Sequence, residues 1–163
     1  MSSATVMMAA VDISQGQIDF LVRLAVAAGM GMAIGIEREV REHSAGLRTH
    51  MLVSLGACLF TLVSAYGFEA VDGGGLGQPE PTRVASNIVT GVGFLGAGSI
   101  LREGLSVRGL TTAATMWIVA AVGMAVGLGM FWAGGVTVAI TLASLLFLRP
   151  VRRRLHQLGE EED

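Results

Sequence analysis

The sequence predicts an all-α integral membrane protein with five transmembrane helices. Charged residues make up 15 % of the chain, well below the roughly 25 % that is usual in soluble domains. Hydrophobic residues make up 52 %, and apolar runs of about 17 to 20 residues, close to the length that spans a bilayer, occur five times. A soluble all-α protein is the alternative, and it would require five unusually apolar helices.

The five apolar runs define one transmembrane domain over residues 18–149. Residues 1–17 are expected to form an N-terminal tail, and residues 150–163 a C-terminal tail. Asp19 and Arg23 lie four residues apart at the start of the first run, where a helix would let them form an ion pair. The spans are expected at about 18–36, 51–68, 84–101, 112–129 and 132–148.

The positions of the arginines predict the orientation. All eleven basic residues are arginine. Only Arg23 and Arg83 lie on the side of the N-terminus, and both are at the edge of a span. Loops rich in arginine stay in the cytoplasm, so the N-terminus is predicted outside and the C-terminus in the cytoplasm. The arginines on the predicted cytoplasmic side are Arg38, Arg41, Arg48, Arg102, Arg108, Arg149, Arg152, Arg153 and Arg154.

Glycine is abundant, with 23 residues, and several glycines fall inside the predicted spans. A glycine within a helix costs about 1 kcal/mol relative to alanine in water, whereas in lipid it lets helix backbones approach closely. We therefore expect residues 83–117 to form the packing centre of the protein. The glycines expected to pack helices are Gly31, Gly35, Gly91, Gly93, Gly96, Gly98, Gly123 and Gly127.

A weak internal repeat relates the first two spans to the third and fourth. Gly35 precedes a Gly-Leu-x-Thr motif at residues 46–49, and Gly98 precedes the same motif at residues 109–112 with the same spacing. This pattern favours a parallel repeat about an axis along the membrane normal. The alternative is that the two motifs recur by chance because both hairpins need such a turn.

Three polar residues near the span ends form a candidate polar or ion site: Glu37, Arg83 and Asn87. Mg²⁺ is held by one or two carboxylates and keeps several waters, so Glu37 could contribute to a metal site. Asn87 could line a polar pathway or hydrogen-bond across helices as a structural residue. The alternative for Glu37 is a carboxylate paired with a nearby arginine: Arg38, Arg41 or Arg48.

The starts of the second and fourth spans are a second candidate, because helix N-termini present free N–H groups to an anion or lipid headgroup. Helix caps and positive-inside arginines would explain the same residues without a ligand. The residues are Arg48, Thr49, His50, Arg108, Thr111 and Thr112. Near the C-terminus, Arg152, Arg153 and Arg154 are expected to bind anionic lipid.

The sequence does not indicate an enzyme. Cys58 is the one cysteine, which excludes an intramolecular disulfide and a cysteine-cluster metal site. There is no P-loop, no HExxH motif and no nucleophile–base pair, and nothing points to a nucleic-acid partner.

Four segments together resemble the MgtC/SapB family of bacterial inner-membrane proteins over nearly the whole chain. The glutamate of Glu80-Pro81-Thr82-Arg83 stands where the family usually has aspartate, and Asn87 where it often has glutamine. The four segments are GIERE (35–39), AGLRTHMLVSLGACLF (45–60), RVASNIVTGVGFLGAG (83–98) and VRGLTTAATMW (107–117).

The resemblance implies a link to magnesium homeostasis, to growth at low Mg²⁺ and to bacterial survival inside host cells. It also implies the transmembrane part of the family without the soluble ACT-like domain of its longer members, as in a short SapB-like member or a shortened chain. One hypothesis is an ion transporter in which replacing Glu37 or Asn87 abolishes growth at low Mg²⁺. The other is a non-transporting regulator that packs against another membrane protein complex. Because five spans enclose little volume, a homo-oligomer is expected.

Overall fold

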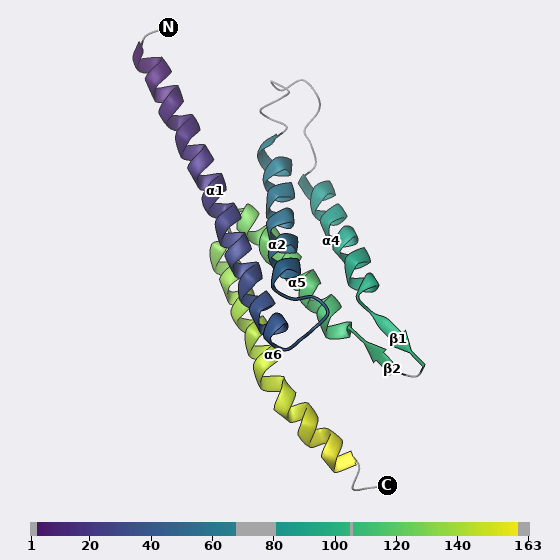
Figure 1. The fold of residues 1–163 in the computed structure, drawn as a ribbon. Helices are drawn as coiled ribbons and strands as arrows, with labels where there is room; N and C mark the ends of the chain where they lie inside the picture. The colour runs from purple at the N-terminus through teal and green to yellow at the C-terminus, as the bar shows by residue number, and fades with distance from the viewer. Residues whose placement is uncertain (1–2, 68–80, 105, 160–163) are drawn as a thin grey trace.

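The computed structural model is a bundle of helices with one short β-hairpin (Figure 1). It describes the backbone of residues 3–67, 81–104 and 106–159, and the side chains of residues 16–66, 83–102, 104 and 106–147. The elements are α1 (Ser3–Val40), α2 (Leu47–Leu62), the π-helical turn η1 (Val63–Gly67), α4 (Pro81–Gly98), β1 (Leu101–Glu103), β2 (Ser106–Arg108), α5 (Leu110–Gly127) and α6 (Phe131–Gly159).

Three of the described helical segments are long and apolar enough to cross a membrane: Gly16–Val40, Leu47–Tyr66 and Leu110–Gly127. A shorter apolar segment, Phe131–Phe147, lies within α6. Large apolar side chains also cover the outside of the bundle, as at Phe94, which is 80 % exposed. An apolar exterior of this extent indicates contact with lipid, so the chain is a multi-pass membrane protein.

The element boundaries differ from the expected ones at three places. Helix α1 begins at Ser3, so the described part of the expected N-terminal tail, residues 3–17, is helical. Helix α4 ends at Gly98, and an antiparallel pairing of Leu101–Glu103 with Ser106–Arg108 follows it. Helix α6 continues to Gly159, past the expected end of the last span.

Two helices end in the same backbone motif. In α5, the Gly129 N–H donates to the Val126 carbonyl and the Met130 N–H to the Ala125 carbonyl, and Gly129 has a positive φ of 80°. This is a Schellman motif, in which glycine takes the left-handed position at no steric cost. In α1 the corresponding residue is Glu42, with φ 55°, and its position turns the chain sharply from α1 towards α2.

The packing centre of the bundle is α2, which lies between α1 and α5. On one side, a Cβ at Gly31 would lie 2.6 Å from the His50 carbonyl oxygen, and one at Gly35 2.7 Å from the Leu47 Cα. On the other side, a Cβ at Gly123 would overlap a carbonyl oxygen of α2, and one at Gly127 would lie 3.0 Å from the Cys58 carbonyl oxygen. Two glycine pairs spaced four residues apart therefore let both neighbours approach the backbone of α2.

The expectation that residues 83–117 form the packing centre is wrong for the described chain. A Cβ added at Gly91, Gly93 or Gly98 would meet no atom within 4 Å, and one at Gly96 would make only an ordinary contact at 3.4 Å with Ala113. Glycine density alone does not show which glycines face a neighbouring helix. Helix α4 packs against α5 and α2, while Gly91, Gly93 and Gly98 stay exposed.

The proposed repeat is matched at the starts of the second and fourth spans and not at the ends of the first and third. Gly46 precedes α2 and Gly109 precedes α5 as the N-cap residue. However, Gly35 lies inside α1, whereas Gly98 is the last residue of α4. The β-hairpin thus replaces the final turns that α4 would need to match α1, and the repeat stays a prediction.

Candidate functional site

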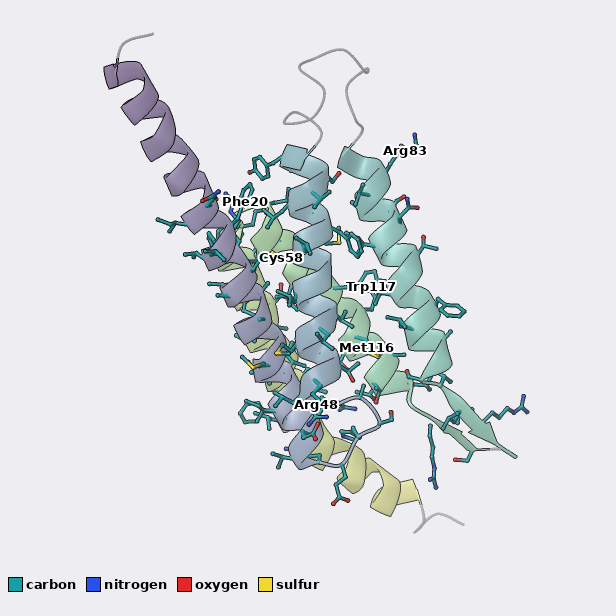
Figure 2. The ribbon with its side chains drawn as sticks, turned by 45° about the horizontal axis from the view of Figure 1, so that its top comes forward. Phe20, Arg48, Cys58, Arg83, Met116 and Trp117 are labelled. Carbon is teal, nitrogen blue, oxygen red and sulfur yellow. The ribbon has the colours of Figure 1, made fainter. Side chains whose placement is uncertain are left out.

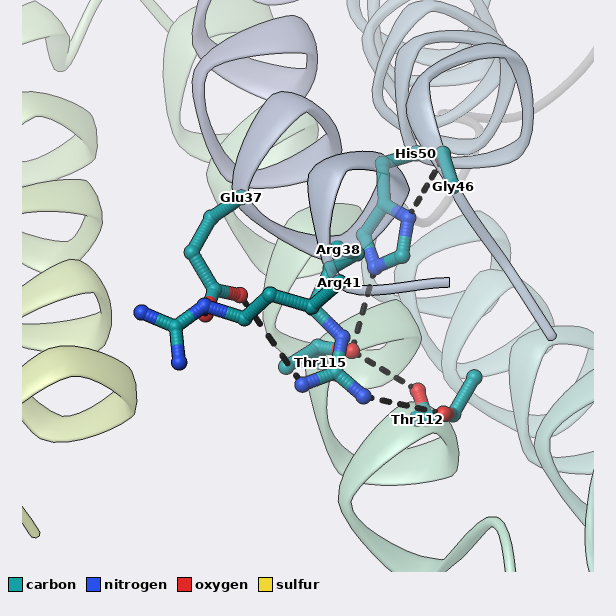
Figure 3. A network of polar contacts seen from close by, with 7 residues as sticks. All are labelled: Glu37, Arg38, Arg41, Gly46, His50, Thr112 and Thr115. Atoms are coloured by element: carbon teal, nitrogen blue, oxygen red, sulfur yellow. Dashed lines mark hydrogen bonds and ion pairs between the residues drawn. The ribbon is translucent and has the colours of Figure 1, made fainter. Parts of the chain in front are cut away.

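A buried polar cluster lies where α1 ends and where α2 and α5 begin (Figure 3). Arg38, in the last turns of α1, is 3 % exposed, and its Nη2 donates a hydrogen bond of 3.1 Å to Oγ1 of Thr112. Thr112 lies in the first turn of α5 and is also 3 % exposed. A charge this deeply buried is tolerated only where hydrogen bonds and counter-charges replace water, so Arg38 ties α1 to α5.

His50 forms the second part of the cluster and ties α2 to α5. Its side chain is fully buried, with Nδ1 2.9 Å from the Gly46 carbonyl oxygen and Nε2 3.0 Å from Oγ1 of Thr115. A carbonyl oxygen only accepts, so Nδ1 carries a proton. The Thr115 hydroxyl also lies 2.9 Å from the Thr112 carbonyl oxygen.

In the neutral ring that carries its proton on Nδ1, Nε2 accepts a hydrogen bond from the Thr115 hydroxyl. This hydroxyl has a single proton, so it donates either to Nε2 of His50 or to the Thr112 carbonyl oxygen. Thr115 therefore links the ring of His50 to the first turns of α5.

Glu37 is the acidic member of the cluster. Its side chain is 9 % exposed, with Oε1 2.6 Å from Nε of Arg41 and Oε2 3.9 Å from Nη1 of Arg38. Of the two interpretations of Glu37, the structure therefore shows the carboxylate paired with arginine. Two guanidinium groups flank one carboxylate, and this positive balance does not suit Mg²⁺, which binds oxygen ligands and is repelled by cations.

Glu39 completes the cluster from the exposed side. Its Oε2 accepts a hydrogen bond of 2.9 Å from the Leu47 N–H, in the first turn of α2. A side chain at Gly46 would overlap this carboxylate. A carboxylate at a helix N-terminus is favourable because of the free N–H groups and the helix dipole. The second glutamate of the GIERE segment therefore caps the next helix.

The three residues of the predicted polar or ion site do not lie together in the structure. Glu37 lies in the polar cluster, whereas Arg83 lies at the opposite end of the bundle, at the start of α4 (Figure 2). Asn87 is one turn further along α4, is exposed, and lines a cavity between α4 and α2. Glu37 and Arg83 therefore do not form one site within this chain.

The residues of the second candidate site, at the N-terminal ends of α2 and α5, do lie at one end of the bundle. Their environments differ. His50 and Thr112 are buried in the cluster, Thr49 is partly buried, and the others point outwards. The N-terminus of α2 is already occupied by the Glu39 carboxylate. The exposed residues are Arg48, Arg108 and Thr111.

Two further predictions concern lipid and metal. The side chains of Arg152, Arg153 and Arg154 lie outside the described residues, so their binding to lipid stays a prediction. Within the part of the chain that the structure describes, no three His, Cys, Asp or Glu side chains cluster as a metal site would require.

The opposite end of the bundle holds a second polar contact, centred on Arg23. The expected ion pair is confirmed, with Arg23 Nη2 2.7 Å from Oδ2 of Asp19. Nη1 of Arg23 also donates to the Gly127 carbonyl oxygen at 2.8 Å and to the Tyr66 hydroxyl at 3.2 Å. A cation that hydrogen-bonds the last carbonyls of a helix stabilises that end, so Arg23 holds the C-terminus of α5.

From the sequence, Arg38 was expected as a cytoplasmic arginine and as a possible partner of Glu37, and Thr115 was not singled out. The spacing of residues along the helices could have indicated that Arg38 and Thr115 are buried. Gly31, Gly35 and Arg38 follow the i, i+4, i+7 pattern of one helix face, and the first two contact α2. Thr112 and Thr115 are three residues apart on the buried face of α5. A polar residue on a small-residue face is therefore a candidate for a buried contact.

The sequence profile named "MgtC family" matches residues 24–154, a stretch that includes the polar cluster and all of α2, α4 and α5. The chain belongs to the MgtC family. This match covers most of the chain and confirms the resemblance carried by the four sequence segments.

Among curated relatives, the chain is 46 % identical to the "Putative magnesium transporter YhiD" of Escherichia coli K12 over 140 residues, which cover 84 % of this chain and 64 % of the relative. It is 42 % identical to the "Protein MgtC" of Salmonella typhimurium strain 14028s over 139 residues, 85 % of this chain and 56 % of the relative. The chain thus spans between half and two thirds of the length of these relatives. No solved structure matches it significantly.

Proposed function

We propose that this MgtC-family chain serves magnesium homeostasis as a membrane regulator and does not itself conduct Mg²⁺. The family match and the name of the Escherichia coli relative support the link to magnesium. Membership of the family does not distinguish a transporter from a regulator. The arrangement of charges around Glu37 supports a regulator rather than a transporter.

One observation carries the proposal. Glu37, the acidic residue of the predicted ion site, is held between Arg41 at 2.6 Å and Arg38 at 3.9 Å. Two unit charges of like sign 4 Å apart repel by about 4 kcal/mol at an effective dielectric constant of 20. A divalent cation that reached Glu37 would be repelled by both arginines. The charges at this end of the bundle therefore oppose the passage of Mg²⁺.

The proposed location is the bacterial inner membrane, with five spans, the N-terminus outside and the C-terminus in the cytoplasm. The distribution of arginine supports this orientation. It puts the polar cluster and the β-hairpin on the cytoplasmic side. A partner membrane protein or a second copy of the chain would then complete the regulator, which is consistent with the apolar outer face of α4.

Growth at low Mg²⁺ tests the proposal. The wild-type chain is expected to restore growth to a bacterial strain that lacks its own MgtC-family protein and fails at low Mg²⁺. Glu37→Gln keeps an oxygen that accepts from Arg41 and removes the charge that a Mg²⁺ route would need. Arg38 loses a counter-charge in this variant, so growth is compared at equal amounts of protein in the membrane. At equal amounts we expect this variant to restore growth like the wild type, which is the reverse of the result expected for a transporter.

Arg48→Gln is the matched control, because Arg48 is exposed near the same end of the bundle and lies outside the described polar cluster. Loss of growth with Glu37→Gln, at a normal amount of protein in the membrane and with Arg48→Gln unaffected, would favour a transporter. Failure of the wild-type chain to restore growth would contradict the link to magnesium.

A further inference from the structure

A large apolar groove lies between α2 and α4, which run side by side in Figure 1. Its volume is about 670 Å³. Gly56 of α2 and Gly91 of α4 form part of its walls, and a Cβ at either glycine would meet no atom within 4 Å. Exposed Leu52 and Phe60 lie at its rim, so the groove opens sideways from the bundle.

The length of the groove matches one leaflet of a bilayer. Its α4 wall runs from Val84 to Leu95, which at 1.5 Å per residue is about 16 Å. The hydrocarbon core of a bilayer is about 30 Å thick, so one leaflet contributes about 15 Å. A groove of this length accommodates one acyl chain from end to end.

The width of the groove also accommodates an acyl chain. Dividing about 670 Å³ by this length gives a mean cross-section of about 40 Å². A flexible hydrocarbon chain is thin enough to lie within this cross-section.

The polar residues at the outer end match the head of a phospholipid. Arg83 is exposed at the start of α4, where Figure 2 shows it at the end of the bundle. Asn87 lies one turn closer to the membrane centre, and it is the one polar side chain among the described residues that line the groove. Guanidinium groups bind phosphate well, and an amide N–H donates to a carbonyl such as that of a lipid ester.

We propose that the groove between α2 and α4 binds one phospholipid. Its acyl chain lies along Gly56 and Gly91, its phosphate binds Arg83, and its ester carbonyl accepts from Asn87. In the proposed orientation this lipid belongs to the outer leaflet. The site is separate from the cytoplasmic arginines Arg152–Arg154 and from the polar cluster.

Native mass spectrometry of the detergent-purified full chain tests the site, with phosphatidylglycerol and diacylglycerol of identical acyl chains added back after removal of lipid. We expect one bound phosphatidylglycerol per chain, at least about fivefold preferred over diacylglycerol, because one arginine near a lipid headgroup contributes about that factor. In Arg83→Gln the preference is expected to fall below about twofold, with chain binding retained. Asn87→Leu is expected to weaken the binding of both lipids.

Two glycine variants of α4 form a matched pair. Gly91→Leu fills the groove and is expected to abolish the binding of both lipids. Gly93→Leu adds the same side chain where a Cβ likewise meets no atom within 4 Å, at a residue that does not line the groove, and it should bind like the wild type. Equal lipid binding by Gly91→Leu and the wild type, no preference for phosphatidylglycerol, or a dimer without bound lipid would overturn the proposal.

Discussion

At the residue scale, the unusual feature is an arginine that is buried in a membrane protein and paired on several sides. Arg38 is 3 % exposed, hydrogen-bonds Thr112 and lies 3.9 Å from the Glu37 carboxylate. Removing one partner from a buried pair is costly because the other partner loses its counter-charge. The cluster therefore joins the C-terminal end of α1 to the N-terminal ends of α2 and α5.

Arg38→Met keeps much of the apolar volume and removes the charge. We expect it to lower the free energy of unfolding by about 3 kcal/mol, because Thr112 and Glu37 lose a partner in a buried site. Denaturant unfolding in detergent micelles measures this. Arg48→Met, at an exposed residue, should stay within about 0.5 kcal/mol of the wild type. Equal stability of the two variants would show that the Arg38 contacts contribute little.

At the element scale, the arrangement of the helices depends on which glycines face a neighbour. Gly31 and Gly35 fit against α2 from one side, and Gly123 and Gly127 fit from the other. In contrast, Gly91 and Gly93 of α4 meet no atom at the position of an added Cβ. The close contacts between helices, here called the seam, are thus made by these two pairs of glycines. Helix α2 lies between the two pairs.

Gly123→Ala and Gly93→Ala compare the two kinds of glycine. A Cβ at Gly123 would overlap the Ser54 carbonyl oxygen, so α2 and α5 must separate, and we expect a loss of about 1–3 kcal/mol in stability. At Gly93 the Cβ enters open space, and alanine should be neutral or stabilise the helix by up to about 1 kcal/mol. Thermal unfolding in micelles measures both, and a loss at Gly93 as large as at Gly123 would contradict the placement of the seam.

The sequence predicted where the helices lie along the chain better than it predicted which helices pack against each other. Apolar length identified the helices, and the glycines expected to pack included the two pairs that do, Gly31 with Gly35 and Gly123 with Gly127. The sequence could not separate these from Gly91, because that distinction depends on which helices become neighbours. Hydropathy also could not reveal the β-hairpin after Gly98, which is too short for a periodic signal. Likewise, the pairing of Glu37 with arginine was one of two open interpretations, since spacing along a helix does not fix a side-chain rotamer.

At the scale of the whole molecule, the proposed orientation has the N-terminus outside and the C-terminus in the cytoplasm. It predicts on which side of the membrane each turn lies. Cysteines placed at Met130, in the turn between α5 and α6, and at Ser106, in the β-hairpin, should lie on opposite sides. In a Cys58→Ala background, a membrane-impermeant maleimide added to intact bacterial spheroplasts should label Met130→Cys and leave Ser106→Cys unlabelled. The opposite pattern would reverse the orientation, and labelling of both would contradict the number of spans.

The proposed function requires a chain that supports magnesium homeostasis without conducting the ion, because the two arginines beside Glu37 disfavour a divalent cation. The most direct measurement is Mg²⁺ entry into liposomes that contain the purified chain and a Mg²⁺-sensitive dye. We expect an entry rate equal to that of protein-free liposomes, while an added ionophore raises it. A rate above this background that Glu37→Gln abolishes would contradict the proposed function and establish a conducting protein.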